Sequence, residues 1–263
     1  MQGIIDENTE EFLNGYGFPI VAFVFAVLLV RFIATRVKSG PSEEELEAFK
    51  VPSEGGALQR MKKDAAGNVN LKLAKKIKIT DDTYIFRFSF EDPDLTFGLP
   101  IGNHVIFKAP IGENGEQVSR KYTPISDVLN TGFVDFVIKI YRKNVHPKFP
   151  EGGLMTQHLE SLNPGNSLLV QGPVGRLQYH GFGNFEILRR PFPNHRTNIG
   201  MLAGGTGITP IYSVLQSSLR NEDKNTMSLL FGNRTVDDIL MKEELTQLQA
   251  GNEELFKLHF TVD

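Results

Sequence analysis

The rhythm of the sequence changes near residue 198, and this change limits the possible folds more than any other feature. Before it, short segments with apolar residues at every second position follow one another, separated by turn residues. After it, short apolar strands alternate with helical segments. Closely spaced strands predict an antiparallel sandwich or barrel, whereas strands that alternate with helices predict a parallel sheet. We therefore expect two differently built domains, over residues 69–190 and 191–263.

Strands dominate the first of these domains. Residues 84–90 and 133–141 alternate most clearly, and residues 105–108 and 167–171 are shorter candidates. One helix is expected among them, at residues 154–162, where leucines recur at helical spacing. In residues 133–141, one predicted face carries Val134, Phe136, Ile138 and Ile140. The opposite face carries Phe133, Asp135, Val137, Lys139 and Tyr141.

The second domain follows a strand–helix pattern. Strands are expected at residues 198–203, 227–231 and 255–262, with one helix ending near residue 220 and another, capped by Asp237 or Asp238, ending near residue 249. Three strands and two helices make half of a doubly wound sheet. The partner half would normally supply the other edge of the sheet and much of its crevice.

The N-terminus has a different character. Residues 12–30 carry no charge, and as a helix they would extend roughly 28 Å, close to the thickness of a bilayer core. Acidic residues precede this stretch and basic residues follow it, which favours a membrane anchor with the N-terminus outside and the rest in the cytosol. A secretory signal would have a basic leading flank, and a buried core helix is the other alternative. We expect an anchor over residues 1–38 and a linker over residues 39–68.

Composition excludes several kinds of site. The net charge is −3 with 22% charged residues, which leaves no electrostatic footprint for a nucleic acid. The chain has no cysteine, so disulfides and thiolate metal sites are excluded. Its six histidines are scattered without the spacing of metal ligands. We therefore expect no metal and no nucleic-acid partner.

Two glycine motifs each precede a predicted helix. Residues 201–210 read M-L-A-G-G-T-G-I-T-P, and residues 151–156 read E-G-G-L-M-T. Glycine lets a backbone approach a ligand closely, and a helix N-terminus favours a phosphate. Each motif alone is equally an ordinary turn into a helix. Two such motifs in differently built domains indicate two nucleotide-type ligands.

Two further motifs carry polar groups. Residues 231–238, F-G-N-R-T-V-D-D, place acids after the second strand of the parallel sheet, where a carboxylate commonly binds an adenosine ribose. Capping of the next helix is the alternative role for these acids. Residues 120–126, R-K-Y-T-P-I-S, combine a cation, a ring and a hydroxyl. This segment is either a plain strand edge or one wall of a site for an anionic, planar ligand.

Taken together, the motifs are similar to those of a known family. In order, the chain has R-K-Y-T-P-I-S, V-I-K-I-Y, H-P-K-F-P-E-G-G-L-M-T, G-P-V-G, G-G-T-G-I-T-P and F-G-N-R-T-V-D-D-I-L. From about residue 71 to residue 263, this order resembles the NADH-cytochrome b5 reductases, within the ferredoxin-reductase-like flavoenzymes. The resemblance implies an antiparallel FAD-binding β-barrel followed by a Rossmann-like parallel-sheet domain that binds NADH. The flavin-and-NADH portion of nitrate reductases is similar too, but those chains carry further large domains.

The resemblance also assigns site residues. On the FAD side, Arg120 would bind the pyrophosphate, Tyr122 would line the flavin, and Thr123 would hydrogen-bond near the reactive flavin nitrogen. Thr123 and Thr206 are the implied catalytic residues. The complete set of implied cofactor contacts is Arg120, Tyr122, Thr123, Val137, Lys139, Tyr141, Phe149, Gly152, Gly153, Met155, Thr156, Gly204, Gly205, Thr206, Phe231, Asn233 and Asp238.

These contacts divide by the part of each cofactor they would meet. The family pattern places Phe149 at the adenine of FAD and puts its pyrophosphate against Gly153, Met155 and Thr156. Residues 204–206 would meet the flavin and the nicotinamide. The adenosine of NADH would lie among Phe231, Asn233 and Asp238. Asp238 favours NADH over NADPH, and the neighbouring Arg234 would weaken that preference.

Three departures from the family pattern stand out. Lys121 replaces a proline, and Leu154 replaces a common lysine. The family also continues with a C-G-P-P-type stretch and a terminal aromatic residue that position nicotinamide. Their absence predicts a NADH-binding domain that is truncated in this sequence.

The implied activity is transfer of a hydride from NADH to FAD and then of single electrons to a haem protein, with cytochrome b5 as the expected partner. The anchor places the enzyme on the cytosolic face of the endoplasmic reticulum or the mitochondrial outer membrane. Basic residues that would meet an acidic partner are Lys75, Lys76, Lys121, Arg142, Lys143 and Lys148. The alternatives are an FAD-binding regulatory protein without turnover, and a reductase with another acceptor, such as a ferric chelate or a nitrate-reducing partner.

Overall fold

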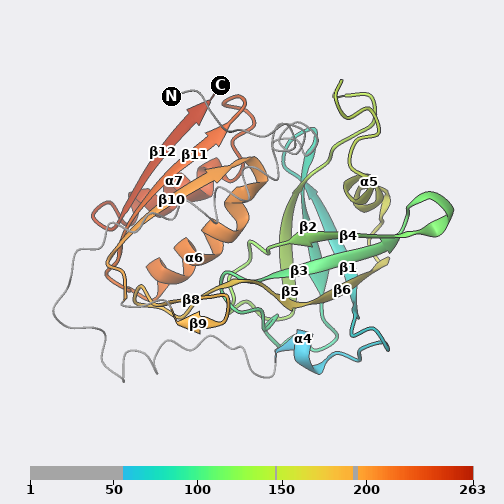
Figure 1. Ribbon diagram of the computed structural model, residues 1–263, viewed down its shortest axis with the longest axis horizontal. Helices are drawn as coiled ribbons and strands as arrows, with labels where there is room; N and C mark the ends of the chain where they lie inside the picture. The colour runs from blue at the N-terminus through green and yellow to red at the C-terminus, as the bar shows by residue number, and fades with distance from the viewer. Residues whose placement is uncertain (1–55, 146, 192–194, 263) are drawn as a thin grey trace, which may run out of the picture.

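The computed structural model describes residues 56–145, 147–191 and 195–262 (Figure 1). An antiparallel sheet forms one side of the molecule and a parallel sheet the other, with helix α6 (Ile208–Arg220) between them. The expected anchor at residues 1–38 lies outside the described residues. Across the ranges that are described, no helix is both long and apolar enough to cross a membrane.

Six antiparallel strands build the first sheet, in the spatial order β4-β3-β6-β1-β2-β5. Their bounds are β1 (Val69–Lys78), β2 (Thr83–Ser89), β3 (His104–Pro110), β4 (Gln117–Tyr122), β5 (Phe133–Lys139) and β6 (Ser167–Val174). A short 3-10 turn, η1 (Glu113–Gly115), lies between β3 and β4. Helix α5 (Leu154–Ser161) connects β5 to β6 and matches the expected helix closely. The antiparallel architecture predicted from the alternating segments is therefore confirmed.

The segment that follows β4 bridges the two edge strands of this sheet. The backbone N–H of Ile125 donates to the carbonyl of Asp135 in β5, at 2.9 Å. The N–H of Asp135 in turn donates to the hydroxyl of Ser126, at 3.1 Å. These bonds draw β4 and β5 toward each other, so the sheet curls into a barrel. Residues 120–126 therefore contribute to barrel closure in addition to any role in a site.

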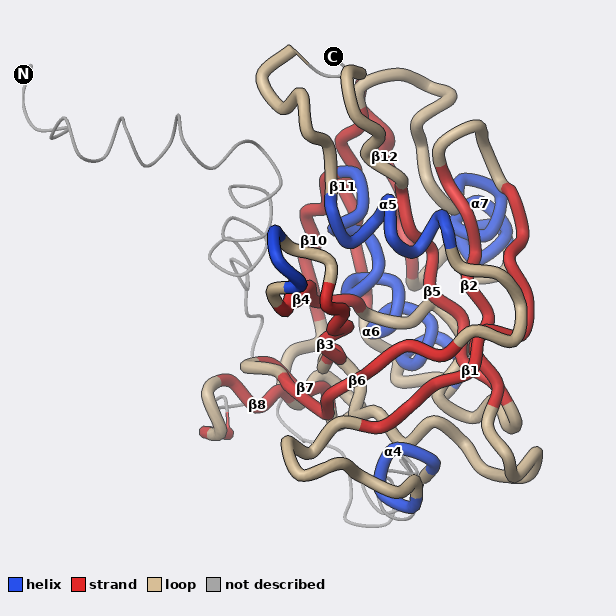
Figure 2. The backbone as a smooth tube through the Cα atoms, turned by 90° about the vertical axis from the view of Figure 1, so that its right-hand side faces the viewer, coloured by secondary structure: helices blue, strands red, loops and turns tan. Residues whose placement is uncertain are grey.

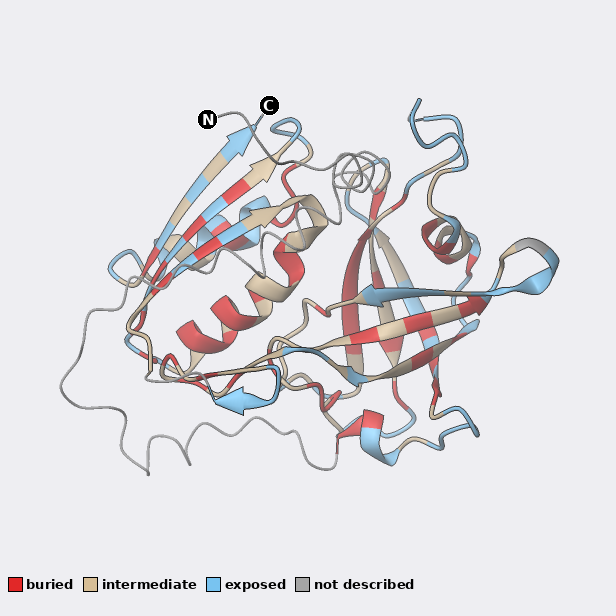
Figure 3. Ribbon diagram, viewed as in Figure 1, coloured by how far each residue is buried: buried red, intermediate tan, exposed pale blue. Residues whose placement is uncertain are grey.

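Aromatic rings fill the barrel. Figure 3 shows buried segments, in red, along the strands of the barrel. Phe107 is fully buried and packs edge-on against Phe136 and Phe88, with ring centroids 4.8 Å and 5.6 Å apart. Val134, Phe136, Ile138 and Ile140, which share one predicted face, are at most 3% exposed and belong to the barrel core. Asp135 and Val137 on the opposite face are buried as well.

The end of the predicted linker is packed against the barrel. Helix α4 (Ala57–Arg60) buries Ala57 and Leu58 completely, and the N–H of Ala57 donates to the carbonyl of Thr96 at 2.8 Å. This last part of the predicted linker therefore packs on the barrel through two apolar side chains. The rest of the linker, residues 39–55, lies outside the described residues.

A small three-stranded sheet was not predicted. Strands β7 (Leu177–Tyr179), β8 (Phe185–Ile187) and β9 (Arg190–Pro191) follow the barrel and lie beneath α6. Each strand is too short to display an alternating pattern. Tyr179 anchors them, because its fully buried hydroxyl donates to the Asp223 carboxylate, beyond the end of α6.

The second domain contains the predicted parallel sheet. Strands β10 (Asn198–Gly204), β11 (Thr226–Asn233) and β12 (Phe256–Val262) pair in parallel and in chain order, so β10 is an edge within the described part of the chain. A 3-10 turn, η2 (Gly205–Gly207), leads from β10 directly into α6. Helix α7 (Lys242–Ala250) connects β11 to β12. Figure 2 shows the same arrangement from the side of the barrel.

Helix α7 begins later than expected. Its N-cap is Met241, so neither Asp237 nor Asp238 caps it. Instead, the hydroxyl of Thr235 donates to Asp238 at 3.1 Å and accepts from the N–H of Asp238 at 3.2 Å, which closes a separate turn. This competing local hydrogen bond explains why the capping interpretation was wrong.

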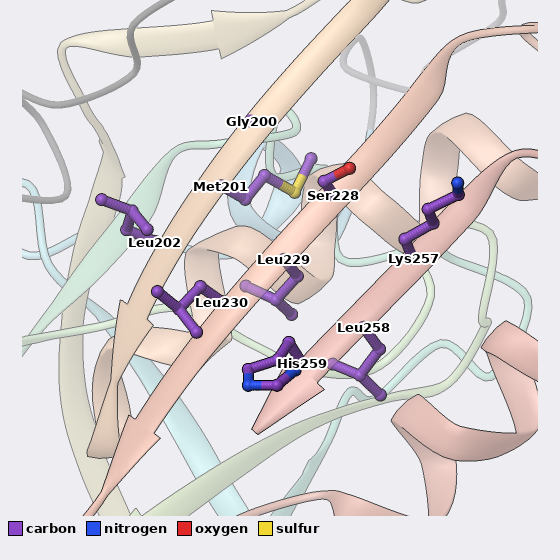
Figure 4. Close-up of a pocket in the computed structure, with 9 residues that line it drawn as sticks. All are labelled: Gly200, Met201, Leu202, Ser228, Leu229, Leu230, Lys257, Leu258 and His259. Atoms are coloured by element: carbon purple, nitrogen blue, oxygen red, sulfur yellow. The ribbon is translucent and has the colours of Figure 1, made fainter. Parts of the chain in front are cut away.

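The two faces of the parallel sheet differ. Side chains on one face pack against α6 and α7, and those on the other line a shallow depression of about 570 Å³ (Figure 4). Leu202 and Leu230 on this second face are 37% and 42% exposed. The described helices of this domain therefore cover only one side of its sheet.

Apolar side chains join the domains. Ile85, Ile125 and Val137 of the barrel belong to the same packed cluster as Tyr212 and Leu215 of α6. Val137 is 6% exposed and Leu215 is fully buried. Helix α6 is thus shared, because it covers the parallel sheet on one side and contacts the barrel on the other.

Candidate functional site

The end of β5 connects the barrel to the second domain through polar contacts. The ammonium of Lys139 lies 2.5 Å from the carboxylate of Asp238, beyond β11, and 3.1 Å from that of Asp82, in the turn between β1 and β2. The side chain of Thr206, in the glycine turn (residues 204–207), lies near the hydroxyl of Tyr141 and partly offsets the rise that burial causes in the pKa of this phenol. Four residues that sequence reasoning assigned to the site therefore meet in two pairs.

Electrostatics at this junction favour the charged forms. Burial on its own would lower the pKa of Lys139, but hydrogen bonds to two carboxylates outweigh it and leave the pKa above its ordinary value. The Lys139 hydrogen bond holds the pKa of Asp238 below its usual value of 3.8. Asp82 was missed from sequence, since it was interpreted only as a turn residue. The pairing of Lys139 with two acids depends on the fold and not on any local motif.

Residues 120–126 present the groups that the resemblance assigned to FAD. Arg120 is exposed on β4, and its guanidinium donates to the carbonyl of Ser119 at 2.8 Å. The Tyr122 ring packs 4.6 Å from that of Phe107, and burial raises the pKa of its phenol. Thr123 is half-buried where the chain leaves β4. This arrangement combines an accessible cation, a fixed ring and a hydroxyl, and their roles toward FAD remain predictions.

The turn into α5 forms a backbone cradle. Gly152 has a φ of +65°, and a Cβ added there would collide with the carbonyl of Tyr141. The N–H of Gly153 donates to that same carbonyl at 2.8 Å, and no side chain caps the start of α5. The first N–H groups of a helix have no partner within the helix, and an uncapped helix start suits a phosphate. The cradle lies directly beside the end of β5.

Two residues predicted for this cradle have buried side chains. Met155 is 1% exposed and belongs to the barrel core. The Thr156 hydroxyl donates to the carbonyl of Gly153 at 3.0 Å and accepts from the N–H of Tyr141 at 3.1 Å. Neither side chain is free for a ligand, so any contact with a pyrophosphate is made by their backbone. Phe149, by contrast, is 44% exposed beside the cradle.

The glycine turn at residues 204–207 is open. Gly205 adopts a φ of +48°, and a Cβ added at Gly205 or Gly207 would have no atom within 4 Å. Thr206, between them, is held by Tyr141. The turn is half-buried, and the free space at both glycines leaves room for a ligand beside its backbone.

The end of β11 contains an unsatisfied amide. Both the oxygen and the nitrogen of the Asn233 side chain are buried without a hydrogen-bond partner in the described part of the molecule. Buried polar groups are normally paired, so this amide fits a site completed by a ligand. The Phe231 side chain is fully buried in the core cluster that includes α6, with its ring 6.2 Å from that of Phe260. The contact of Phe231 with adenosine stays a prediction. Val137 is likewise buried at the domain interface.

Several cations expected to meet a partner are engaged within the barrel. Lys76 donates to the carbonyls of Glu160 and Leu162, at 2.6 Å and 3.1 Å, and so caps the end of α5. Arg142 pairs with Glu160 at 2.5 Å, and Lys143 pairs with an exposed Glu151. Lys75 and Lys121 are exposed. Exposed ion pairs are weak, so Lys143 stays available to a partner, whereas Lys76 and Arg142 chiefly hold α5.

Comparison with known proteins identifies the two domains. Residues 70–179 match the family model described as an oxidoreductase FAD-binding domain, and residues 201–262 match that of an oxidoreductase NAD-binding domain. The chain is 43% identical to human NADH-cytochrome b5 reductase 2 over 205 residues, which cover 76% of this chain and 74% of the relative.

Nitrate reductases are similar to the same extent in sequence. A nitrate reductase of Phaseolus vulgaris is 45% identical over 193 residues, and these cover 73% of this chain but only 21% of the relative. The solved cytochrome b5 reductase domain of Ulva prolifera nitrate reductase superimposes with a TM-score of 0.71 at 38% identity, covering 76% of this chain and 75% of that one.

These domains bind FAD and NADH. Three features of the structure fit the two cofactors: the unsatisfied Asn233 amide, the backbone cradle before α5 and the open glycine turn. The antiparallel barrel followed by a parallel sheet agrees with the fold of the solved relative. The chain therefore belongs to the NADH-cytochrome b5 reductase family of FAD-containing oxidoreductases.

Proposed function

We propose that this reductase passes electrons from NADH through FAD to cytochrome b5 or a similar haem protein. The observation that carries the proposal is the junction at the end of β5, where Lys139 meets Asp238 and Tyr141 meets Thr206. It brings the FAD-side segment and the glycine turn of the NADH side together. FAD, when bound, takes two electrons from NADH as a hydride and releases them one at a time.

The residues of the chain contribute binding and placement. Arg120 supplies positive charge for the FAD pyrophosphate, assisted by the N–H groups at the start of α5. Thr123 offers a hydroxyl to the flavin edge. The contact between Tyr141 and Thr206 supports the turn that would face nicotinamide. Val137 belongs to the apolar cluster that joins the two domains.

Cytochrome b5 is preferred as acceptor because the chain matches 74% of human NADH-cytochrome b5 reductase 2. In the bean nitrate reductase the matched part is about a fifth of the whole. The test compares steady-state reduction of purified cytochrome b5 with that of ferricyanide, at equal NADH. We expect both acceptors to be reduced. Reduction of ferricyanide with no reduction of cytochrome b5 would contradict the proposed acceptor and favour another haem or metal partner.

A membrane location on the cytosolic side, at the endoplasmic reticulum or the mitochondrial outer membrane, is part of the proposal. It is supported by the uncharged run at residues 12–30 and by the charges on its flanks. Fractionation after an alkaline wash tests it with the full chain and a chain lacking residues 1–38. We expect only the full chain in the membrane pellet. Release of the full chain into the supernatant would contradict anchoring.

A further inference from the structure

Helix α6 extends from one wall of the cofactor site to a second, distant contact with the barrel. It starts at Ile208, directly after the glycine turn, and its 13 residues end at Arg220, roughly 20 Å away. There, Nη1 of Arg220 lies 2.5 Å from both carboxylate oxygens of Asp127. Asp127 is the residue that follows the 120–126 segment. One ion pair thus joins the end of the FAD-side wall to the helix that carries the nicotinamide-side turn.

Each partner of this ion pair makes a second hydrogen bond that orients its side chain. Asp127 also accepts the N–H of Leu129 at 2.8 Å, and Arg220 also donates to the side chain of Asn221 at 3.3 Å. Their side chains are only 24% and 18% exposed, for Arg220 and Asp127 respectively. A cation also suits the C-terminal end of a helix. Exposed ion pairs contribute little because they immobilise flexible side chains, but here much of that ordering is already done.

The interface around this ion pair is apolar. Ile125 and Val128, on either side of Asp127, pack into the apolar cluster that includes Tyr212 of α6. Apolar packing is non-directional, and domains within one chain commonly move against each other. Polar contacts at both ends of α6, Tyr141–Thr206 and Asp127–Arg220, restrict such sliding and rotation.

We propose that Asp127 and Arg220 are positioning residues that hold α6 at the orientation in which Thr206 faces the segment containing Thr123. The inference rests on the proposed function only in that these two walls hold NADH and FAD. Neither residue was assigned to the site from sequence, and Asp127 lies four positions beyond Thr123. Misplacement of reacting groups by about 1 Å can slow a reaction by about 100-fold, so a distant clamp can control the rate.

The first test measures orientation without turnover. Because the chain has no cysteine, Lys72→Cys in β1 and Gln247→Cys in α7, both at least partly exposed, give two unique sites for spin labels. The distance distribution between the labels is recorded in the full chain, with FAD, by pulsed electron paramagnetic resonance. Asp127→Asn, which keeps an acceptor for Leu129, and Arg220→Gln are each expected to broaden it about twofold. Arg220→Lys, which keeps the charge, is expected to leave the distance distribution nearly as narrow as in the unaltered chain.

The second test measures flavin reduction by NADH in a stopped-flow instrument, on protein of equal FAD content. We expect Asp127→Asn and Arg220→Gln to slow reduction about tenfold with little change in NADH affinity. Arg87→Gln is the matched control: Arg87 donates two hydrogen bonds to Asp135, 2.8 Å and 2.7 Å long, but both partners lie in the barrel. It should leave both the label distances and the reduction rate unchanged.

The outcomes separate this inference from the proposed function. If the unaltered chain is not reduced by NADH, the proposed function fails, and the label distances still test the clamp. If the unaltered chain is reduced, and both clamp variants keep the original distance distribution and rate, the inference is overturned. It is overturned as well if Arg87→Gln broadens the label distances as much as the clamp variants do.

Discussion

The barrel and the parallel sheet bury the apolar side chains of their strands in different ways. The barrel closes on itself through residues 123–126, and its aromatic side chains meet inside. The three-stranded sheet covers one face with α6 and α7, while Leu202 and Leu230 stay substantially exposed on the other. The barrel is therefore expected to be stable by itself, whereas the sheet depends on α6 and on the contacts that α6 makes with the barrel. The cofactor site lies where these two modes of construction meet.

The largest expected effect contrasts the two regions directly. Phe107→Ala would open a cavity among the barrel rings and lower the free energy of unfolding by about 3–5 kcal/mol. Leu230→Ala, on the open face of the sheet, should cost less than about 0.5 kcal/mol. Chemical denaturation of both variants measures the difference. Similar losses of unfolding free energy in the two variants would mean that the open face is covered in solution. They would contradict the expected difference between the two regions.

A second prediction concerns the two glycine sites. Gly152→Ala places a Cβ against the carbonyl of Tyr141 at a left-handed φ, and should cost about 1–3 kcal/mol of local strain. The backbone cradle would open and FAD affinity would fall. Gly165→Ala is the matched control, because its φ is also positive, at +97°, but a Cβ there meets no atom within 4 Å. FAD content is measured by absorbance after gel filtration. Equal content in the two variants would show that the cradle is not part of the FAD site.

The junction between the regions is tested by Lys139→Met. It leaves Asp238 without its cation, and we expect the KM for NADH to rise about tenfold, equivalent to about 1.4 kcal/mol. Lys78→Met, which breaks the exposed Lys78–Asp81 pair, serves as control. Because the pKa of Asp238 is lowered in the folded protein, the stabilisation from this ion pair is present above pH 3.8 and is lost as the pH falls through the lower folded value. An unchanged KM in Lys139→Met would show that the pair plays no part in binding NADH.

The smallest effect is expected at His104, at the start of β3. Burial lowers its pKa from 6.5 to about 4, and its Nε2 has no partner among the described residues. The unfolded chain therefore takes up a proton between pH 6.5 and pH 4 while the folded barrel does not, so stability falls as the pH drops through this window. After solvent screening we expect a loss of about 1 kcal/mol. Denaturation curves of the native chain and His104→Gln across this range should converge toward low pH, and parallel curves would contradict the assignment.

Sequence periodicity predicted the elements whose patterns are long. Residues 133–141 alternate over a full strand, and β10 to β12 are separated by recognisable helices, so both sheets were expected from the sequence. Strands β7 to β9 are too short to carry a pattern. The start of α7 was misplaced because Thr235 competes for Asp238. Local sequence patterns therefore predict an element correctly where one interaction dominates. They mispredict it where several interactions compete.

The candidate site shows the same division. Glycine turns and the polar residues at strand ends could be recognised, because their chemistry is local. The burial of Phe231 in the core depends on packing under α6, and the Asp127–Arg220 pair joins residues 93 positions apart. No local pattern predicts either. Contacts between domains therefore had to come from the structure.

The most direct measurement is an anaerobic titration of the purified, FAD-loaded chain with NADH, followed by the visible absorbance of the flavin. We expect a yellow protein whose flavin absorbance is bleached by NADH. Thr123→Ala should be impaired in reduction, and Arg120→Ala in FAD retention. A chain that takes up no FAD, or a bound flavin whose spectrum NADH leaves unchanged, would contradict the assignment of the junction at the end of β5 as the site of electron transfer.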